Sequence, residues 1–293
     1  MLMQLRRLLE LVRFSHTVFA LPFALLAALL AWRTEPFRYA DLAGILFCMV
    51  FARSAAMAFN RVADRHLDAA NPRTAGRHLP AGTLTLGTVL VFMVVCVLGF
   101  VSSTLLFLLR DEPNWWPLVC SGPVLAFILA YSLTKRFTAL AHFWLGASLM
   151  LAPVAAWVAI RGLVDLPTPL LIGLAVLFWV AGFDILYACQ DVEFDRRAQL
   201  SSVPARLGVR GALRVAMGCH ALMVGALLGL YFVCPYLGGV YLAGLVGIAG
   251  LLAYEHWLVK PDDLGRVNRA FFHVNGVISV GLFLLVALQL AAK

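Results

Sequence analysis

Long runs of hydrophobic residues recur along the whole sequence and are separated by short polar segments. A run of about 18 or more apolar residues is long enough to cross a bilayer as a helix. The pattern therefore predicts an all-α, polytopic membrane protein with about nine transmembrane helices, in a single domain over residues 1–293. The expected spans are 14–32, 41–60, 84–108, 115–132, 138–160, 168–190, 211–233, 236–256 and 270–291.

The composition supports the same class of protein. Hydrophobic residues make up 62% of the chain, charged residues only 13%, and the mean hydropathy is +0.91. Soluble globular domains carry about 25% charged residues, so this composition excludes a soluble globular domain. The six cysteines lie mostly within the expected spans and have no metal-like spacing, so we interpret them as packing residues.

The net charge of +8 is distributed unevenly over the predicted topology. With a cytoplasmic N-terminus, 17 Lys and Arg residues fall in cytoplasmic segments, Arg53 lies within a span, and five fall on the opposite side. This bias predicts an inner-membrane protein with its N-terminus and its long polar loops in the cytoplasm. Topology accounts for much of the charge, so we expect no nucleic acid partner, and no obligate protein partner is evident. The five Lys and Arg residues on the side opposite the cytoplasm are Arg33, Arg38, Arg110, Arg161 and Lys293.

Two of the expected cytoplasmic connections, Asn60–Leu84 and Asp191–Arg210, are long and mix acidic with basic residues. Polar loops of about 20 residues in a compact protein are usually functional or disordered. Either loop alone is more typical of a solvated segment that only sets topology. Because both contain regularly spaced aspartates, we favour a functional site.

The first connection begins with an amide and two carboxylates spaced four residues apart, at Asn60, Asp64 and Asp68. If the helix continues past Phe59, all three lie along one helical stripe.

The second connection carries Asp184, Asp191 and Asp195 at spacings of seven and four residues, with Tyr187 beside them. On a continuous helix these also form one stripe. Asp184 lies within an otherwise apolar span, where a carboxylate must be paired or face a wet cavity, so a buried hydrogen bond is as plausible as a catalytic role.

Two rows of carboxylates repel each other unless a cation lies between them. Oxygen ligands favour Mg²⁺, which binds through one or two carboxylates while phosphate oxygens take other positions. Arginine and lysine beside the acids suit phosphate recognition. Together these features predict a diphosphate site, and the membrane location suggests a lipid substrate. The basic residues are Arg73, Arg77, Lys135, Arg136, Arg196, Arg197 and Arg206.

At these loops the sequence resembles the UbiA superfamily of intramembrane aromatic prenyltransferases. That family carries an N-D-x-x-D-x-x-x-D type motif after its second helix and a D-x-x-x-D motif after its sixth. Here they correspond to Asn60/Asp64/Asp68 and Asp191/Asp195. Further similarity lies in Ser15–Thr17 with Pro22, in the segment Asn71–Gly82, which resembles N-R-P-L-P-x-G, and in Tyr131–Thr138, which resembles Y-x-x-x-K-R-x-T.

Within the family the chain looks most like the 4-hydroxybenzoate polyprenyltransferases, and especially like members thought to prenylate a dihydroxynaphthoate in the futalosine route to menaquinone. One position departs from the pattern: Arg61 stands where members often have Asp. This departure leaves the number of metal ions open.

The resemblance implies a bundle with a central cavity and Mg²⁺-dependent transfer of a polyprenyl group from its diphosphate to an aromatic hydroxy acid, in ubiquinone or menaquinone biosynthesis. By this resemblance Asn60, Asp64 and Asp68 hold one Mg²⁺, and Asp191 and Asp195 hold a second. The cations Arg73, Arg77, Lys135 and Arg136 bind the diphosphate. Arg53, Asp184 and Tyr187 are expected to orient donor or acceptor.

The motif acids are expected to be exposed, so that Asp64→Asn or Asp191→Asn abolishes turnover without unfolding the protein. Three alternatives stay open. One is a haem- or chlorophyll-directed prenyltransferase of the same superfamily, and another is a CDP-alcohol phosphatidyltransferase, whose motif needs Gly where Arg65 stands. The third is a transporter, which would place its charges near the bilayer midplane.

Overall fold

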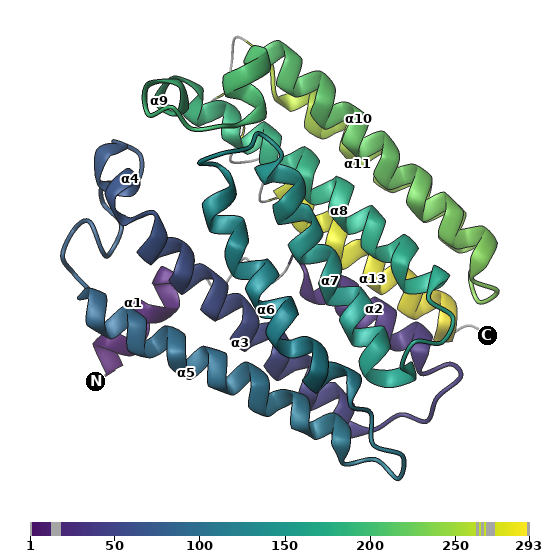
Figure 1. Cartoon of the computed structure of the whole chain (residues 1–293). Helices are drawn as coiled ribbons and strands as arrows, with labels where there is room; N and C mark the ends of the chain where they lie inside the picture. Colours follow the sequence, from purple (N-terminus) through teal and green to yellow (C-terminus); the bar gives the residue numbers. More distant parts are fainter. Residues whose placement is uncertain (1, 13–18, 262–263, 265–266, 268–272, 292–293) are drawn as a thin grey trace. The chain divides into compact units, whose positions relative to one another are not determined.

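The computed structural model describes residues 2–12, 19–261, 264, 267 and 273–291, and this part of the chain is almost entirely helical (Figure 1). Apolar sequence favours helices in a membrane because each helix satisfies its own backbone hydrogen bonds. The elements are α1 (Leu2–Leu11), α2 (Leu21–Ala31), α3 (Tyr39–Ala63), α4 (Arg65–Ala70), α5 (Leu86–Thr104), η2 (Leu105–Leu108), α6 (Trp116–Thr134), α7 (Ala141–Arg161), α8 (Pro167–Ala188), η3 (Cys189–Asp191), α9 (Val192–Arg197), α10 (Val203–Val233), α11 (Gly239–Leu258) and α13 (Asn275–Ala291).

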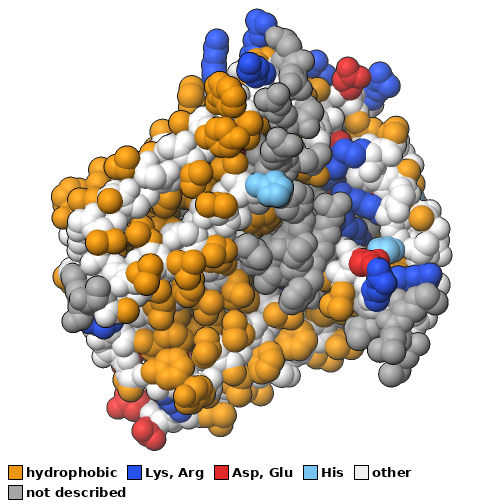
Figure 2. Space-filling model, turned by 180° about the vertical axis from the view of Figure 1, so that it is seen from behind, with side chains coloured by type: hydrophobic (Ala, Val, Ile, Leu, Met, Phe, Trp, Pro, Cys, Tyr) orange, Lys and Arg blue, Asp and Glu red, His pale blue; other side chains and the backbone are white. Residues whose placement is uncertain are grey.

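Among the described residues, seven helical segments are long and apolar enough to cross a membrane, and the shorter helices α2 and α13 are also apolar. These nine segments overlap the nine predicted spans, which supports a multi-pass membrane protein, whereas the number of spans stays a prediction. On the face drawn in Figure 2, hydrophobic side chains are spread widely over the surface, as expected for contact with lipid. The beginning of the first predicted span, including Ser15–Thr17, lies outside the described residues.

The described chain divides into two compact units, so the prediction of one domain over 1–293 stays a prediction. Unit 1 comprises residues 1–17 and 37–133. Its main packing is α3 against α5, which run side by side in Figure 1. Asp41, near the start of α3, is fully buried and bonds to Arg110 through two contacts: Nε–Oδ1 at 3.2 Å and Nη2–Oδ2 at 2.5 Å. This ion pair fixes the end of α3 that lies away from α4.

Unit 2 comprises residues 18–36 and 134–293. In it α8 packs against α7 and α10, α2 packs against α7 and α13, and α11 packs against α10 and α13. The α7 and α8 backbones approach so closely that a Cβ at Gly146 would overlap the carbonyl oxygen of Leu177. Trp179 of α8 is completely buried and lies against Phe23, with ring centroids 5.1 Å apart. Aromatic and small residues therefore form this core.

A chain of buried and half-buried polar side chains crosses four helices of unit 2. The indole Nε1 of Trp179 donates to Asn275 Oδ1 at 2.6 Å, and Asn275 Nδ2 donates to Glu255 Oε1 at 2.7 Å. His220 Nδ1 lies 3.0 Å from His256 Nε2 and 3.9 Å from the other carboxyl oxygen of Glu255. Polar groups inside a membrane helix bundle must satisfy one another, so these side chains bind α8, α10, α11 and α13 together.

We expect Asn275→Leu to destabilise the protein by about 2 kcal/mol, because it leaves the Trp179 donor and the Glu255 acceptor buried without their hydrogen bonds. Glu255→Gln retains a side-chain oxygen that can accept from Asn275 and should have a smaller effect. Thermal unfolding of the purified variants in detergent, followed by circular dichroism, tests this order. An Asn275→Leu variant as stable as the wild type would contradict it.

Candidate functional site

The first acidic group consists of Asn60, Asp64 and Asp68. The helix continues past Phe59, as the spacing requires, and α3 ends at Ala63. Asp64 separates α3 from α4, but the helical backbone bonds persist across it: Asp64 N–Asn60 O is 2.9 Å and Asp68 N–Asp64 O is 2.8 Å. The three side chains therefore keep their four-residue stagger.

The acids of the first group are buried, and the expectation that they are exposed is wrong for Asp64 and Asp68. Their exposed fractions are 2% and 5%. The reason is that the segment after α4 folds back over them: Thr74 Oγ1 donates to the Asp68 carbonyl oxygen at 3.0 Å, and Arg77 Nη1 donates to Asp68 Oδ1 at 2.7 Å. These groups must therefore be satisfied by one another or by a cation.

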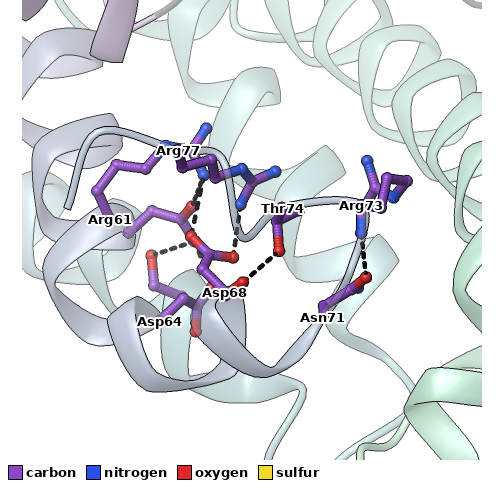
Figure 3. Close-up of polar contacts among 9 residues, drawn as sticks. Arg61, Asp64, Asp68, Asn71, Arg73, Thr74 and Arg77 are labelled. Carbon is purple, nitrogen blue, oxygen red and sulfur yellow. Dashed lines mark hydrogen bonds and ion pairs between the residues drawn. The ribbon is translucent and has the colours of Figure 1, made fainter. Parts of the chain in front are cut away.

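Two arginines lie over Asp68 in Figure 3, namely Arg77 and Arg61. Arg61 is 8% exposed, and its Nη1 donates to Asn60 Oδ1 at 3.2 Å and lies 3.9 Å from Asp68 Oδ2. Arg73 is exposed and lies farther from Asp68 than Arg77 does, and its backbone NH donates to Asn71 Oδ1. Of the two predicted diphosphate ligands in this loop, the structure brings Arg77 to the acids.

The second acidic group consists of Asp184, Asp191 and Asp195. The prediction of one continuous helical stripe is not met, because α8 ends at Ala188 and the 3₁₀ turn η3 precedes α9. A 3₁₀ turn has fewer residues per turn than an α-helix, so it rotates the later side chains relative to the earlier ones. The predicted connection over 191–210 is also largely helical, since α9 runs to Arg197 and α10 begins at Val203.

Asp195 is fixed by the start of α10. Its Oδ2 accepts from Ser202 Oγ at 2.7 Å, and the same oxygen of Ser202 caps α10 by accepting from Ala205 N at 3.2 Å. Electrostatic neighbours of Asp195 include Asp191 and Lys135. The structure therefore brings two predicted metal ligands and one predicted diphosphate ligand together in unit 2.

Asp184 has a partner that the sequence analysis did not identify. His142 Nδ1 lies 2.7 Å from Asp184 Oδ2, and Val203 N donates to His142 Nε2 at 3.3 Å. A backbone NH can only donate, so Nε2 is the acceptor and Nδ1 carries the proton that Asp184 accepts. A histidine within a predicted span was the available signal, since ionisable residues there are usually functional or paired.

The remaining predicted residues occupy separate positions. Arg53 is half-buried in the middle of α3, and Tyr187 is half-buried in the last turn of α8. Lys135 is half-buried just after α6, where its carbonyl oxygen accepts from Ser201 N at 2.7 Å, and Arg136 is exposed beside it. The roles expected of these residues stay predictions.

The first acidic group suits Mg²⁺ chemically. In the described part of the chain no three His, Cys, Asp or Glu side chains converge as a complete metal site. Mg²⁺ does not require one, since it binds through one or two carboxylates and keeps water or phosphate oxygens as other ligands. Asp68 Oδ2 is buried and has no hydrogen-bond partner among the described residues, so it is an oxygen able to receive a cation.

Comparison of the sequence with known proteins identifies the family to which this chain belongs. The model of the UbiA prenyltransferase family matches residues 20–277. A 4-hydroxybenzoate octaprenyltransferase of Methylococcus capsulatus is 30% identical over 248 residues, which cover 82% of this chain and 80% of that protein. The enzyme of the same name from Tolumonas auensis is 31% identical, covering 82% and 79%.

Solved structures with this fold include the apo structure of a UbiA homologue from Aeropyrum pernix K1. Its sequence is 31% identical to this chain, and the TM-score is 0.81. The match covers 95% of this chain and 98% of the homologue. A UbiA homologue from Archaeoglobus fulgidus, bound to DMAPP and Mg²⁺, has a TM-score of 0.74, covers 98% of this chain and 100% of its own, and is 17% identical. The latter likeness concerns the fold alone.

Proposed function

Because this chain belongs to the UbiA prenyltransferase family, we propose that it transfers a polyprenyl group from polyprenyl diphosphate to an aromatic hydroxy acid. The chain is an intramembrane transferase, and the family match over residues 20–277 is the observation that carries this conclusion. The names of the relatives support 4-hydroxybenzoate as the acceptor class. The alternative acceptor is 1,4-dihydroxy-6-naphthoate, and both products belong to quinone biosynthesis.

Two acidic groups contribute to the proposed chemistry. Asn60, Asp64 and Asp68 provide oxygen ligands for one Mg²⁺, and Asp191 with Asp195 provides ligands for a second. Bound Mg²⁺ supplies positive charge to the donor diphosphate. The buried, oxygen-only composition of the first group supports the assignment, as does the Mg²⁺ in the Archaeoglobus fulgidus homologue.

The arginines and lysines act on the leaving group. Negative charge grows on the diphosphate as the allylic C–O bond breaks, and cations already in place stabilise that state more than the ground state. Arg77, held 2.7 Å from Asp68, suits this role, and Arg73, Lys135 and Arg136 are proposed to add to it. Arg53, Asp184 and Tyr187 are proposed to orient the donor or the acceptor.

Charge placement supports the proposed orientation, with the N-terminus and both acidic groups in the cytoplasm. It follows that the soluble aromatic acceptor arrives from the cytoplasm, while the isoprenoid tail of the donor stays in the membrane. Apolar surroundings would protect the allylic cation from water.

A membrane assay with radiolabelled polyprenyl diphosphate and Mg²⁺ tests the function. Parallel reactions contain 4-hydroxybenzoate, 1,4-dihydroxy-6-naphthoate or no acceptor, and Asp68→Asn membranes are the blank. We expect one acceptor to yield a prenylated product together with pyrophosphate. Donor that binds but gives no product with either acid would overturn the proposed acceptor class, and no donor binding would favour a transporter.

Removal of divalent metal should abolish transfer. Treatment with EDTA is expected to lower product formation at least about 100-fold, since metal-based charge stabilisation contributes several kcal/mol to the transition state. Addition of Mg²⁺ in excess of the chelator should restore the rate. Transfer that continues at the original rate in EDTA would contradict a role for the two acidic groups as metal ligands.

A further inference from the structure

Arg61 is a basic residue that contacts two members of the first acidic group, Asn60 and Asp68. It is next to Asn60 in the last turn of α3, and its side chain is 9% exposed. A guanidinium in such surroundings is retained only where it is paired and hydrogen-bonded. Its position therefore reflects interaction with the acids and not with solvent.

The contacts of Arg61 are with oxygens that are proposed to bind metal. Nη1 donates to Asn60 Oδ1 at 3.2 Å and lies 3.9 Å from Asp68 Oδ2. The Asn60 amide cannot easily turn away, because its Nδ2 donates to Asp64 Oδ2 at 3.1 Å and to Ser132 Oγ at 3.3 Å. Asn60 Oδ1 is thus held on the side of the guanidinium.

The pairing of Asp68 is uneven. Oδ1 receives a short charge-assisted bond from Arg77 at 2.7 Å, whereas Oδ2 has only the more distant Arg61 and no hydrogen bond among the described residues. An ion pair at 3.9 Å without a hydrogen bond is weaker than a direct carboxylate–metal bond. A divalent cation can therefore displace Arg61 from Asp68 Oδ2 more readily than it can displace Arg77 from Oδ1.

We propose that Arg61 is a resident cation of the first acidic group, which competes with the divalent metal for Asn60 Oδ1 and Asp68 Oδ2 and, once displaced, donates to the diphosphate of the prenyl donor. This inference rests on the proposed function. A guanidinium offers five N–H donors in a planar fork that matches phosphate oxygens. Metal and donor then favour each other's binding, and the coupling is reciprocal.

Mn²⁺ binding to the purified protein in detergent, measured by electron paramagnetic resonance with and without inorganic pyrophosphate, tests the proposal. In the wild type we expect pyrophosphate to tighten Mn²⁺ binding. Arg61→Gln should tighten Mn²⁺ binding about tenfold without pyrophosphate and lose part of the further tightening, since pyrophosphate oxygens also bind the metal directly. Mn²⁺ that binds to the wild type but not to Asp68→Asn is Mn²⁺ bound at the first acidic group.

Arg65→Gln is the matched control. It removes the same charge four residues away, but the Arg65 guanidinium donates to the Val62 carbonyl oxygen at 3.0 Å. We expect its Mn²⁺ affinity to change less than about twofold. Equal tightening in both variants, or unchanged affinity in Arg61→Gln, would overturn the proposal.

If Arg61→Gln does not fold, Arg61→Lys provides a second test of the proposal. Lysine retains the charge but not the fork, so Mn²⁺ affinity without pyrophosphate should stay within about twofold of the wild type, while the pyrophosphate effect should shrink. An undiminished pyrophosphate effect would overturn the second half of the proposal. Because the readout is metal binding, it stands or fails independently of whether prenyl transfer to either acceptor is detected.

Discussion

Asp191→Asn should lower the rate of prenyl transfer at least about 100-fold and leave the protein folded, since loss of one preorganised electrostatic group costs about that much in catalysis. Asp191 ends the η3 turn and is only half-buried, so the isosteric amide fits the same space. Turnover of radiolabelled donor by the purified variant gives the rate, and size-exclusion chromatography in detergent shows whether the protein is folded.

Glu193→Gln provides the comparison for this variant. Glu193 lies two residues away on α9, its side chain is 85% exposed, and its ion pair with Arg197 is 3.8 Å long. The same change from carboxylate to amide at this position should leave the rate within about twofold of the wild type. Equal losses in the two variants would show that the charge of the whole segment matters, and not the carboxylate of Asp191.

Asp41→Asn should cause the largest loss of stability among single isosteric changes at the ion pairs described. The variant leaves the Arg110 guanidinium beside a fully buried amide in place of a bidentate carboxylate, and breaking such a pair costs about 3–5 kcal/mol. We expect a lower midpoint of thermal unfolding in detergent, followed by circular dichroism.

Asp165→Asn is the matched control for this experiment. Asp165 also pairs with an arginine, Arg161, at 2.7 Å, but its side chain is 63% exposed. An exposed pair contributes about 0–1 kcal/mol, and asparagine tolerates the positive φ of 51° at this position. A similar loss of stability in both variants would mean that burial does not determine the importance of Asp41.

The helices could be predicted from sequence because each apolar run is longer than a buried β-strand and long enough for a helix that spans a membrane. All nine expected spans overlap a described helix, and a difference lies at the start of α10, where a short helical segment from Val203 joins the rest of α10 across a kink at Gly208. The polar segment 203–210 was assigned to a loop because its charges interrupt the apolar pattern. Ser202, Pro204 and the cap on Ala205 are the local signals of a helix start that this reading overlooked.

The candidate site could be predicted only as far as spacing along one helix determines it. The four-residue spacing placed Asn60, Asp64 and Asp68 correctly, since α3 and α4 nearly form one helix. Burial of the acids depends on a loop that folds back, and the pairing of Asp184 with His142 joins residues 42 positions apart on two consecutive helices. Neither feature is encoded in a local period, so a sequence pattern alone does not reveal it.

The packing of α2 has a consequence for how the chain is assembled during synthesis. This helix contacts α7 and α13, so its first partner is completed only after about 130 more residues have been made, and another partner is the last helix described. At usual synthesis rates the wait for α7 is on the order of ten seconds. During this interval α2 lacks its native neighbours, and a nascent chain stalled before α7 should be a good substrate for membrane chaperones and proteases.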